Sequence, residues 1–149
     1  MSQSLVKNFV HVIFSTKMRQ PLITPDFEIA LYKYLAGTCQ NLNCHPKRVG
    51  GHVDHVHILS DLSKNISVSD FVKEVKQWSS KWMKSKHSQS NFYWQAGYGA
   101  FSVGKRDIES VISYIDQQHA HHKKYTFQEE LRKLMADNDM AFDERYVWD

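Results

Sequence analysis

The sequence predicts an α+β fold in which helices pack on an antiparallel sheet. Three observations lead to this prediction. Residues 8–17 alternate apolar side chains in the manner of a strand. Longer segments repeat apolar residues every three or four positions, which indicates amphipathic helices. In chain order the segments run strand, helix, two strands, helix, strand and helix.

The first strand and the first helix follow from local patterning. Both faces of residues 8–17 are largely apolar, so an inner strand covered on both sides is expected. A helix is expected next, because Thr24 can cap it and Pro25 suits its first position. The predicted buried stripe of this helix comprises Phe27, Ala30, Leu31, Tyr34 and Leu35.

The middle of the chain predicts a pair of strands and a second helix. The stretches "CHPKRVGG" and "HVHILSDL" indicate two short strands joined near Gly50, Gly51 and Asp54. Ser67 with Asp70 approximates a capping box for a helix over about 67–85. Apolar residues recur there at spacings of three and four, which predicts core packing for Phe71, Val75, Trp78 and Trp82.

The second half of the chain predicts a loop, a strand and two helices. The stretch "NFYWQAGYGAFSVG" is aromatic and contains glycines, so we expect a loop that leads into a strand over 100–103. A third helix is expected from about 107 through 122, and a fourth over 127–136. No repeat or linker divides the chain, so residues 1–149 are interpreted as one domain with 123–149 as a C-terminal extension.

The composition limits the classes of protein to consider. The chain has 149 residues, 42% of them hydrophobic, which is enough for one globular domain. No stretch resembles a signal peptide or approaches the ~18 apolar residues of a membrane span. Only Cys39 and Cys44 are available for disulfides, so a cytoplasmic location is expected. A formal charge of +3 permits a nucleic-acid partner without requiring one.

Two histidines in "GGHVDHVHIL" raise the first functional question. His55 and His57 point to the same side of a strand, because successive side chains alternate between its faces. In the same register, Asp54 and His52 are expected to face away from them. The pair indicates either a metal site or a structural feature, and without further context the structural alternative is the commoner one.

A helix near the end of the predicted core presents a second polar set. Tyr114 and Gln118 lie four positions apart, so they are neighbours at one edge of an apolar stripe, and His121 continues that edge. Two imidazoles with an amide oxygen or a third histidine could hold a divalent metal and leave coordination positions open. Such an ion polarises a phosphoryl oxygen, and a nearby tyrosine could then attack the phosphorus. A tyrosine at the edge of the core with its hydroxyl in solvent is the ordinary alternative.

These motifs together resemble a known family. "DHVHIL" with the tyrosine and glutamine of "YIDQQ" resembles the single-tyrosine HUH transposases of small bacterial insertion sequences, the IS200-like class. "STKMRQPLI" after the first strand and "FYWQAGYGAFSVG" before the tyrosine helix match as well. The resemblance spans roughly residues 8–122. Val53 departs from it, because many relatives have proline at this place, and the role of residues 123–149 is left open.

The resemblance implies a fold and an activity. It implies an RRM-like or ferredoxin-like fold, a homodimer, and Mg²⁺ or Mn²⁺ bound by His55, His57 and Gln118. Tyr114, at the metal site of its own subunit or at that of the partner subunit, would attack single-stranded DNA at hairpin-marked element ends and form a 5′-phosphotyrosine. His121 or His122 could replace Gln118 as a ligand. Imidazoles favour Mn²⁺ whereas phosphate chemistry usually uses Mg²⁺, so both ions stay open.

Several weaker interpretations accompany this one. Lys17, Arg19, Lys105 and Arg106 are candidate DNA contacts, although most such charges are simply solvated. The loop aromatics Phe92, Tyr93, Trp94 and Tyr98 could stack on bases or fill space beneath the helices. Cys39, Cys44 and His45 could suggest zinc, but buried thiols are the simpler explanation. The alternative functions are a domesticated DNA-binding or regulatory relative that no longer transposes, and an RNA-binding module, which would need exposed aromatics on the central strands.

Overall fold

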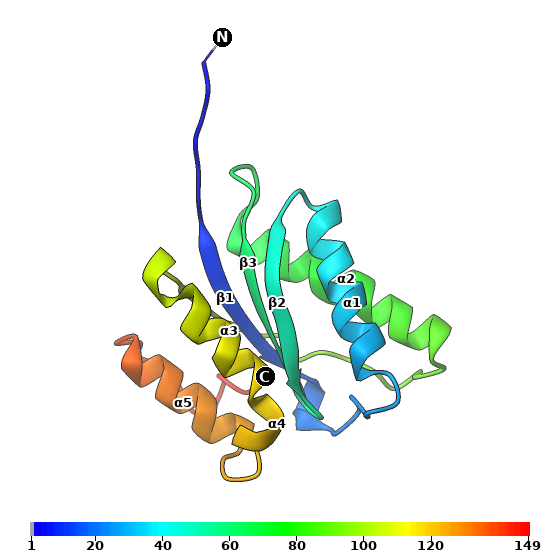
Figure 1. The fold of residues 1–149 in the computed structure, drawn as a ribbon. Coiled ribbons are helices and arrows are strands. Elements are labelled where there is room, and N and C mark those ends of the chain that lie inside the picture. The colour runs from blue at the N-terminus through cyan, green and yellow to red at the C-terminus, as the bar shows by residue number, and fades with distance from the viewer. Residues whose placement is uncertain (1) are drawn as a thin grey trace.

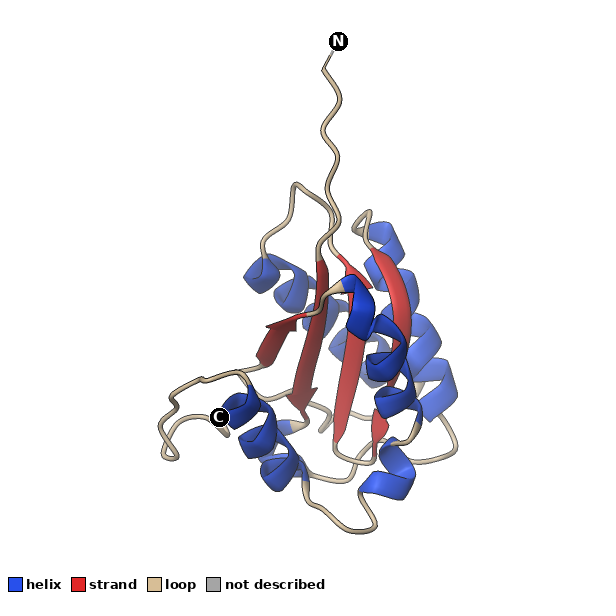
Figure 2. Ribbon diagram, turned by 60° about the vertical axis from the view of Figure 1, so that its left-hand side comes forward, coloured by secondary structure: helices blue, strands red, loops and turns tan. Residues whose placement is uncertain are grey.

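The computed structural model describes residues 2–149 and shows a four-stranded antiparallel sheet with five helices packed on it (Figures 1 and 2). The strand order is β2-β3-β1-β4. The strands are β1 (Phe9–Ser15), β2 (His45–His52), β3 (His55–Asp61) and β4 (Gly99–Ser102). The helices are α1 (Glu28–Asn41), α2 (Val68–Lys86), α3 (Ile108–Asp116), α4 (Gln118–His121) and α5 (Phe127–Asp137). The predicted fold class is confirmed.

The two faces of the sheet carry different side chains. Strand β1 lies between β3 and β4, which explains why both of its faces are apolar and buried. One face packs against α1 and α2, and the other lies beneath α3, α4 and α5 (Figure 1). The first core contains Val12, Phe14, Val56, Ile58, Leu35 and Phe71, among others. The second core is smaller and comprises Ile13, Phe101, Phe127, Leu131 and Met135.

The helix boundaries refine the expectations from the sequence. Helix α2 begins where its cap predicts, because the Ser67 hydroxyl accepts a hydrogen bond from the Asp70 amide at 3.1 Å. Helix α1 begins at Glu28, one turn later than expected, because residues 25–27 form a turn. The predicted continuous helix over 107–122 is wrong. It ends at Asp116, Gln117 leaves the helical conformation (φ −98°, ψ 14°), and α4 begins at Gln118.

Some of the aromatic residues that the sequence analysis singled out are buried, and others are exposed. Trp82 is partly buried and stacks on Tyr34, but the prediction for Trp78 is wrong, because 44% of its surface is exposed. In the loop before β4, Phe92 and Trp94 are buried in the core, whereas Tyr93 and Tyr98 are exposed. The loop therefore fills space beneath the sheet and also leaves two rings at the surface. No helix within residues 2–149 has the length and apolar character needed to cross a membrane.

Candidate active site

His55 and His57 lie side by side on β3 and face α3, α4 and α5. Both are completely buried, and their ring centroids are 5.2 Å apart. Their partners across the sheet are Ser15 and Ile13 of β1. The predicted common orientation of the two rings therefore places them under the helices rather than in solvent.

Each of these rings is held by a second side chain at its Nδ1 atom. Nδ1 of His55 lies 2.7 Å from Oδ1 of Asp54, and Nδ1 of His57 lies 2.7 Å from Nε2 of His11. Both Nε2 atoms point the other way, toward Glu130. Histidines that bind metals are usually held in this manner, because a hydrogen bond at one ring nitrogen fixes the lone pair of the other on the metal.

The expectation that Asp54 and His52 face away from these histidines is wrong. It assumed an unbroken strand, whereas residues 53 and 54 form the turn between β2 and β3. Asp54 therefore reaches back to His55, and His52 pairs directly across the hairpin with His55. The His52 ring stacks on His122, and its Nδ1 lies 2.7 Å from Nδ1 of His119.

Tyr114 and Gln118 reach the same place from the opposite layer. The Tyr114 ring is 5.6 Å from the His57 ring, and Oε1 of Gln118 is 3.0 Å from Nε2 of His55. The break at Gln117 begins a new helix with Gln118, which is buried. All four predicted residues, His55, His57, Tyr114 and Gln118, thus converge within a single chain.

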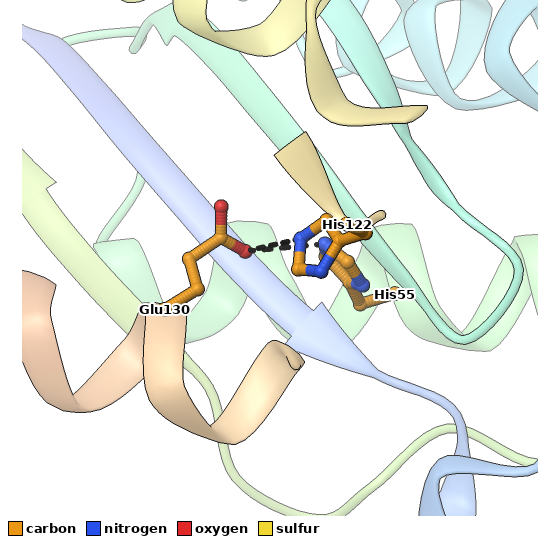
Figure 3. Close-up of side chains that lie close together, drawn as sticks. All are labelled: His55, His122 and Glu130. Atoms are coloured by element: carbon orange, nitrogen blue, oxygen red, sulfur yellow. Dashed lines mark hydrogen bonds and ion pairs between the residues drawn. The ribbon is translucent and has the colours of Figure 1, made fainter. Parts of the chain in front are cut away.

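Glu130 occupies the centre of this group, and sequence reasoning missed it. It comes from α5, its side chain is 1% exposed, and Oε1 lies 3.2 Å from Nε2 of His55 (Figure 3). The same oxygen lies 3.2 Å from Nε2 of His57. Its other oxygen, Oε2, accepts hydrogen bonds from the Tyr114 hydroxyl and from Nε2 of Gln118. The sequence contains one sign that Glu130 is functional. This acidic residue falls among the apolar positions 127, 131 and 135 on the buried face of a predicted helix.

His122 also points into the group. Its Nδ1 lies 2.7 Å from the Tyr125 carbonyl oxygen, and its Nε2 lies 3.1 Å from Oε1 of Glu130 (Figure 3). His121 is more distant, with Nε2 3.6 Å from Oε2 of Glu130. Of the two histidines that could replace Gln118 as a ligand, His122 is therefore the better placed.

The donor set fits a divalent cation. The Nδ1 atoms of His55 and His122 face pure acceptors, the Asp54 carboxylate and the Tyr125 carbonyl, so each must carry a proton there. Their Nε2 atoms then direct lone pairs at two more acceptors, Oε1 of Gln118 and Oε1 of Glu130. Only a positive species, a second proton or a metal ion, can satisfy lone pairs that converge in this way. His55, His122 and Glu130 have the spacing of a metal-binding group.

The pKa values of the residues indicate the same requirement for a positive charge at the centre of the group. Burial opposes a charge on His55, but its hydrogen bonds to Asp54 and Glu130 outweigh burial and raise its pKa to about 9. Burial lowers the pKa of His57, and burial with the neighbouring His57 lowers that of His11 to about 3. Burial raises the pKa of the Glu130 carboxyl, but hydrogen bonds from the surrounding imidazoles outweigh it, and the net pKa is well below the usual range. The site is therefore an anionic centre surrounded by imidazoles.

The nucleophile candidate lies beside an opening. Tyr114 lines a pocket of about 340 Å³ between β1, α3 and α5, together with His11, Glu130 and Lys133. Burial and the nearby Glu130 charge raise the pKa of Tyr114 above its ordinary value, so the hydroxyl stays protonated at neutral pH. A larger pocket of about 640 Å³ between α1 and α2 contains none of the candidate site residues.

The four candidate DNA contacts lie at two ends of the sheet. Lys17 and Arg19 follow β1 at the end where Thr16 donates to the Asp54 carbonyl, close to the histidines. Lys105 and Arg106 precede α3 at the other end, where the Val103 amide bonds the Phe9 carbonyl. Lys17, Lys105 and Arg106 are exposed, and Arg19 is half-buried.

Comparison with known proteins identifies the family and the fold of the chain. The family model described as "Transposase IS200 like" matches residues 4–118. A protein of Deinococcus radiodurans R1 that is assigned as a transposase is similar in structure, with a TM-score of 0.62 and 21% identity over 79% of this chain and 98% of that one. A REP-associated tyrosine transposase bound to a REP hairpin has a TM-score of 0.59 and 16% identity over 82% of this chain and 74% of that one.

No curated protein matches the chain. At 21% and 16% identity, the two similar structures show that the fold is shared. The family match covers more than half of the chain and includes His55, His57, Tyr114 and Gln118. The chain belongs to the IS200-like transposase family.

Proposed function

We propose that this transposase cleaves and rejoins single-stranded DNA through a 5′-phosphotyrosine at Tyr114, with Mg²⁺ or Mn²⁺ bound by His55, His57 and Gln118. One observation carries the proposal. Tyr114 lies 5.6 Å, ring to ring, from a histidine whose Nδ1 is held and whose Nε2 points into the site. A binding module would need neither the nucleophile nor the two oriented imidazoles.

The bonding changes of the proposed step balance without a nucleotide cofactor. The phenolic oxygen of Tyr114 forms a bond to phosphorus as the bond from phosphorus to the 3′-oxygen breaks. The hydroxyl proton leaves Tyr114, and the departing 3′-oxygen gains a proton. The divalent ion supplies Lewis-acid polarisation of the phosphoryl oxygen when it is bound. Attack by another 3′-hydroxyl on the phosphotyrosine reverses these changes and rejoins the strand.

The remaining parts of the proposal concern partners. A single-stranded DNA hairpin is the proposed substrate, and the similar REP-associated transposase with its bound hairpin supports it. Lys17 and Arg19 are the proposed phosphate contacts nearest to the histidines, and Lys105 and Arg106 are proposed contacts before α3 at the opposite end of the sheet. A homodimer is proposed on the family membership, and sedimentation of the purified protein tests it.

A denaturation-resistant adduct tests the chemistry. The protein is incubated with labelled hairpin DNA and Mg²⁺ or Mn²⁺, and the mixture is separated under denaturing conditions. We expect an adduct from the native protein, none from Tyr114→Phe, and an undiminished amount from Tyr125→Phe, which alters an exposed tyrosine. Loss of the adduct in His55→Ala with unchanged DNA affinity places the metal in catalysis. An adduct that persists in Tyr114→Phe shows that another residue is the nucleophile.

A further inference from the structure

We propose that Glu130 is itself a ligand of the divalent ion through Oε1 and positions the Tyr114 hydroxyl through Oε2. Helix α5, in the C-terminal extension beyond the family-matched residues 4–118, would then complete the active centre within the same chain. The inference rests on the proposed function for the presence of the ion. It adds a carboxylate to the ligands that the family resemblance implies.

The two oxygens of Glu130 have different surroundings. Oε1 lies 3.2 Å from Nε2 of His55, 3.2 Å from Nε2 of His57 and 3.1 Å from Nε2 of His122. Neighbouring ligand atoms in an octahedral Mg²⁺ site, each about 2.1 Å from the ion, lie about 3 Å apart. Oε1 and the imidazole nitrogens therefore already have the separation of atoms that share one ion.

The second oxygen joins this cluster to the tyrosine. Oε2 accepts the Tyr114 hydroxyl and, at 2.9 Å, Nε2 of Gln118. These two bonds fix the rotation of the carboxylate, so that Oε1 stays on the side of the imidazoles. A single side chain thus links the metal ligands to the atom that would attack phosphorus.

The charge of Glu130 demands a cationic partner. The carboxylate is buried, and within residues 2–149 its ion-pair partners are all histidines, with no lysine or arginine among them. Burying a carboxylate is costly unless a charge compensates it, and a bound divalent cation would do so. A carboxylate oxygen also supplies the hard ligand that Mg²⁺ prefers, which two imidazoles and an amide supply poorly.

The fold of the C-terminal segment places Glu130 with precision. Thr126 and Glu129 form a capping box that fixes the first turn of α5. Phe127 and Leu131 then pack with Ile13 in the second core, and the Phe127 ring lies 4.8 Å from the His55 ring. Glu130 lies between these two anchors, so its carboxylate has little freedom to swing out of the site.

Calorimetric titration of the metal-free protein with MgCl₂ and with MnCl₂, without DNA, tests the inference. Glu130→Gln keeps the size of the side chain and its hydrogen bond with Tyr114, but it removes the anionic ligand. We expect Mg²⁺ affinity to fall at least about tenfold and Mn²⁺ affinity to fall less, because Mn²⁺ tolerates nitrogen ligands better. Glu109→Gln, which neutralises an exposed carboxylate on α3, serves as the matched control and should bind both ions like the native protein.

Two further variants keep the test decisive. Glu130→Asp retains the charge with a shorter reach and should bind Mg²⁺ with intermediate affinity, which covers the case in which the glutamine variant does not fold. Tyr114→Phe removes only one of the two hydrogen bonds to Oε2 of Glu130 and no ligand, so its Mg²⁺ affinity should fall less than that of Glu130→Gln. Native Mg²⁺ affinity in a folded Glu130→Gln or Glu130→Asp protein would overturn the inference. If DNA adducts persist in Tyr114→Phe while Glu130→Gln loses Mg²⁺, the proposed nucleophile fails and the ligand assignment stands.

Discussion

Nε2 of His11 on β1 lies 2.7 Å from Nδ1 of His57 on β3, and the two rings are stacked with centroids 5.0 Å apart. His11 is 4% exposed, and burial with the neighbouring His57 lowers its pKa to about 3, so it is neutral at physiological pH. A neutral imidazole can accept the Nδ1 proton of His57, which leaves the Nε2 lone pair free for a metal. His11 would thereby act as a positioning residue that holds the His57 ring, without being a metal ligand itself.

Removal of the acceptor on His11 should weaken metal binding. We expect His11→Leu to lower Mn²⁺ affinity about 10- to 100-fold, because the His57 ring loses the partner that fixes its tautomer. His11→Gln, whose amide oxygen can accept the same proton, should lose less. Titration calorimetry measures both, and His45→Leu, which removes an exposed imidazole from β2, is the control. Equal losses in the leucine and glutamine variants would mean that packing rather than the hydrogen bond matters.

Metal binding should release about one proton at pH 7.5. His55 has a pKa of about 9 in the metal-free protein and is then protonated, whereas His57 and His11 have lowered pKa values and Glu130 is ionised. A metal at Nε2 of His55 displaces its proton. Titrations in two buffers with different ionisation enthalpies count the released protons. Asp54→Asn removes one cause of the raised pKa, so the number released should fall.

The same shift predicts how the stability of the metal-free protein depends on pH. The pKa of His55 is higher in the folded chain than its ordinary 6.5, so the folded state holds this proton more tightly than the unfolded state. The resulting stabilisation is complete below pH 6.5 and is lost as the pH rises toward and through 9. Urea unfolding at pH 6.5 and 9 measures it, and His55→Gln should flatten the difference. A native protein without this difference would contradict the assigned hydrogen bonds.

The hairpin between β2 and β3, which positions His55, depends on Gly51. A Cβ atom at Gly51 would lie 2.2 Å from the His55 carbonyl oxygen and 2.9 Å from Cα of Val56. We expect Gly51→Ala to lower the free energy of unfolding by about 3 kcal/mol or more, because backbone atoms must shift. Gly37 in α1 has open space at the same point, so Gly37→Ala should raise stability by up to about 1 kcal/mol. Urea unfolding of both variants measures the contrast, and a neutral Gly51→Ala would show that the hairpin can relax.

The sequence by itself determined the fold class and four members of the candidate site. Periods of two and of three to four follow from backbone geometry, so they place His55 with His57 on one strand face and Tyr114 with Gln118 on one helix edge. The family resemblance then predicts that these two pairs act at one metal ion. These inferences require only the spacing of residues within one strand or helix and the match to the family's motifs.

Only the tertiary structure decided what surrounds those four residues. The sequence predicts a connection near Asp54, but strand alternation does not give the direction of the side chains beside a turn, and only the structure shows that Asp54 and His52 join the site. His11 and Glu130 come from elements 46 and 73 residues away from His57, and their roles depend on which strands pair and where α5 packs. Packing between distant segments sets those distances, and no local period in a single sequence encodes it.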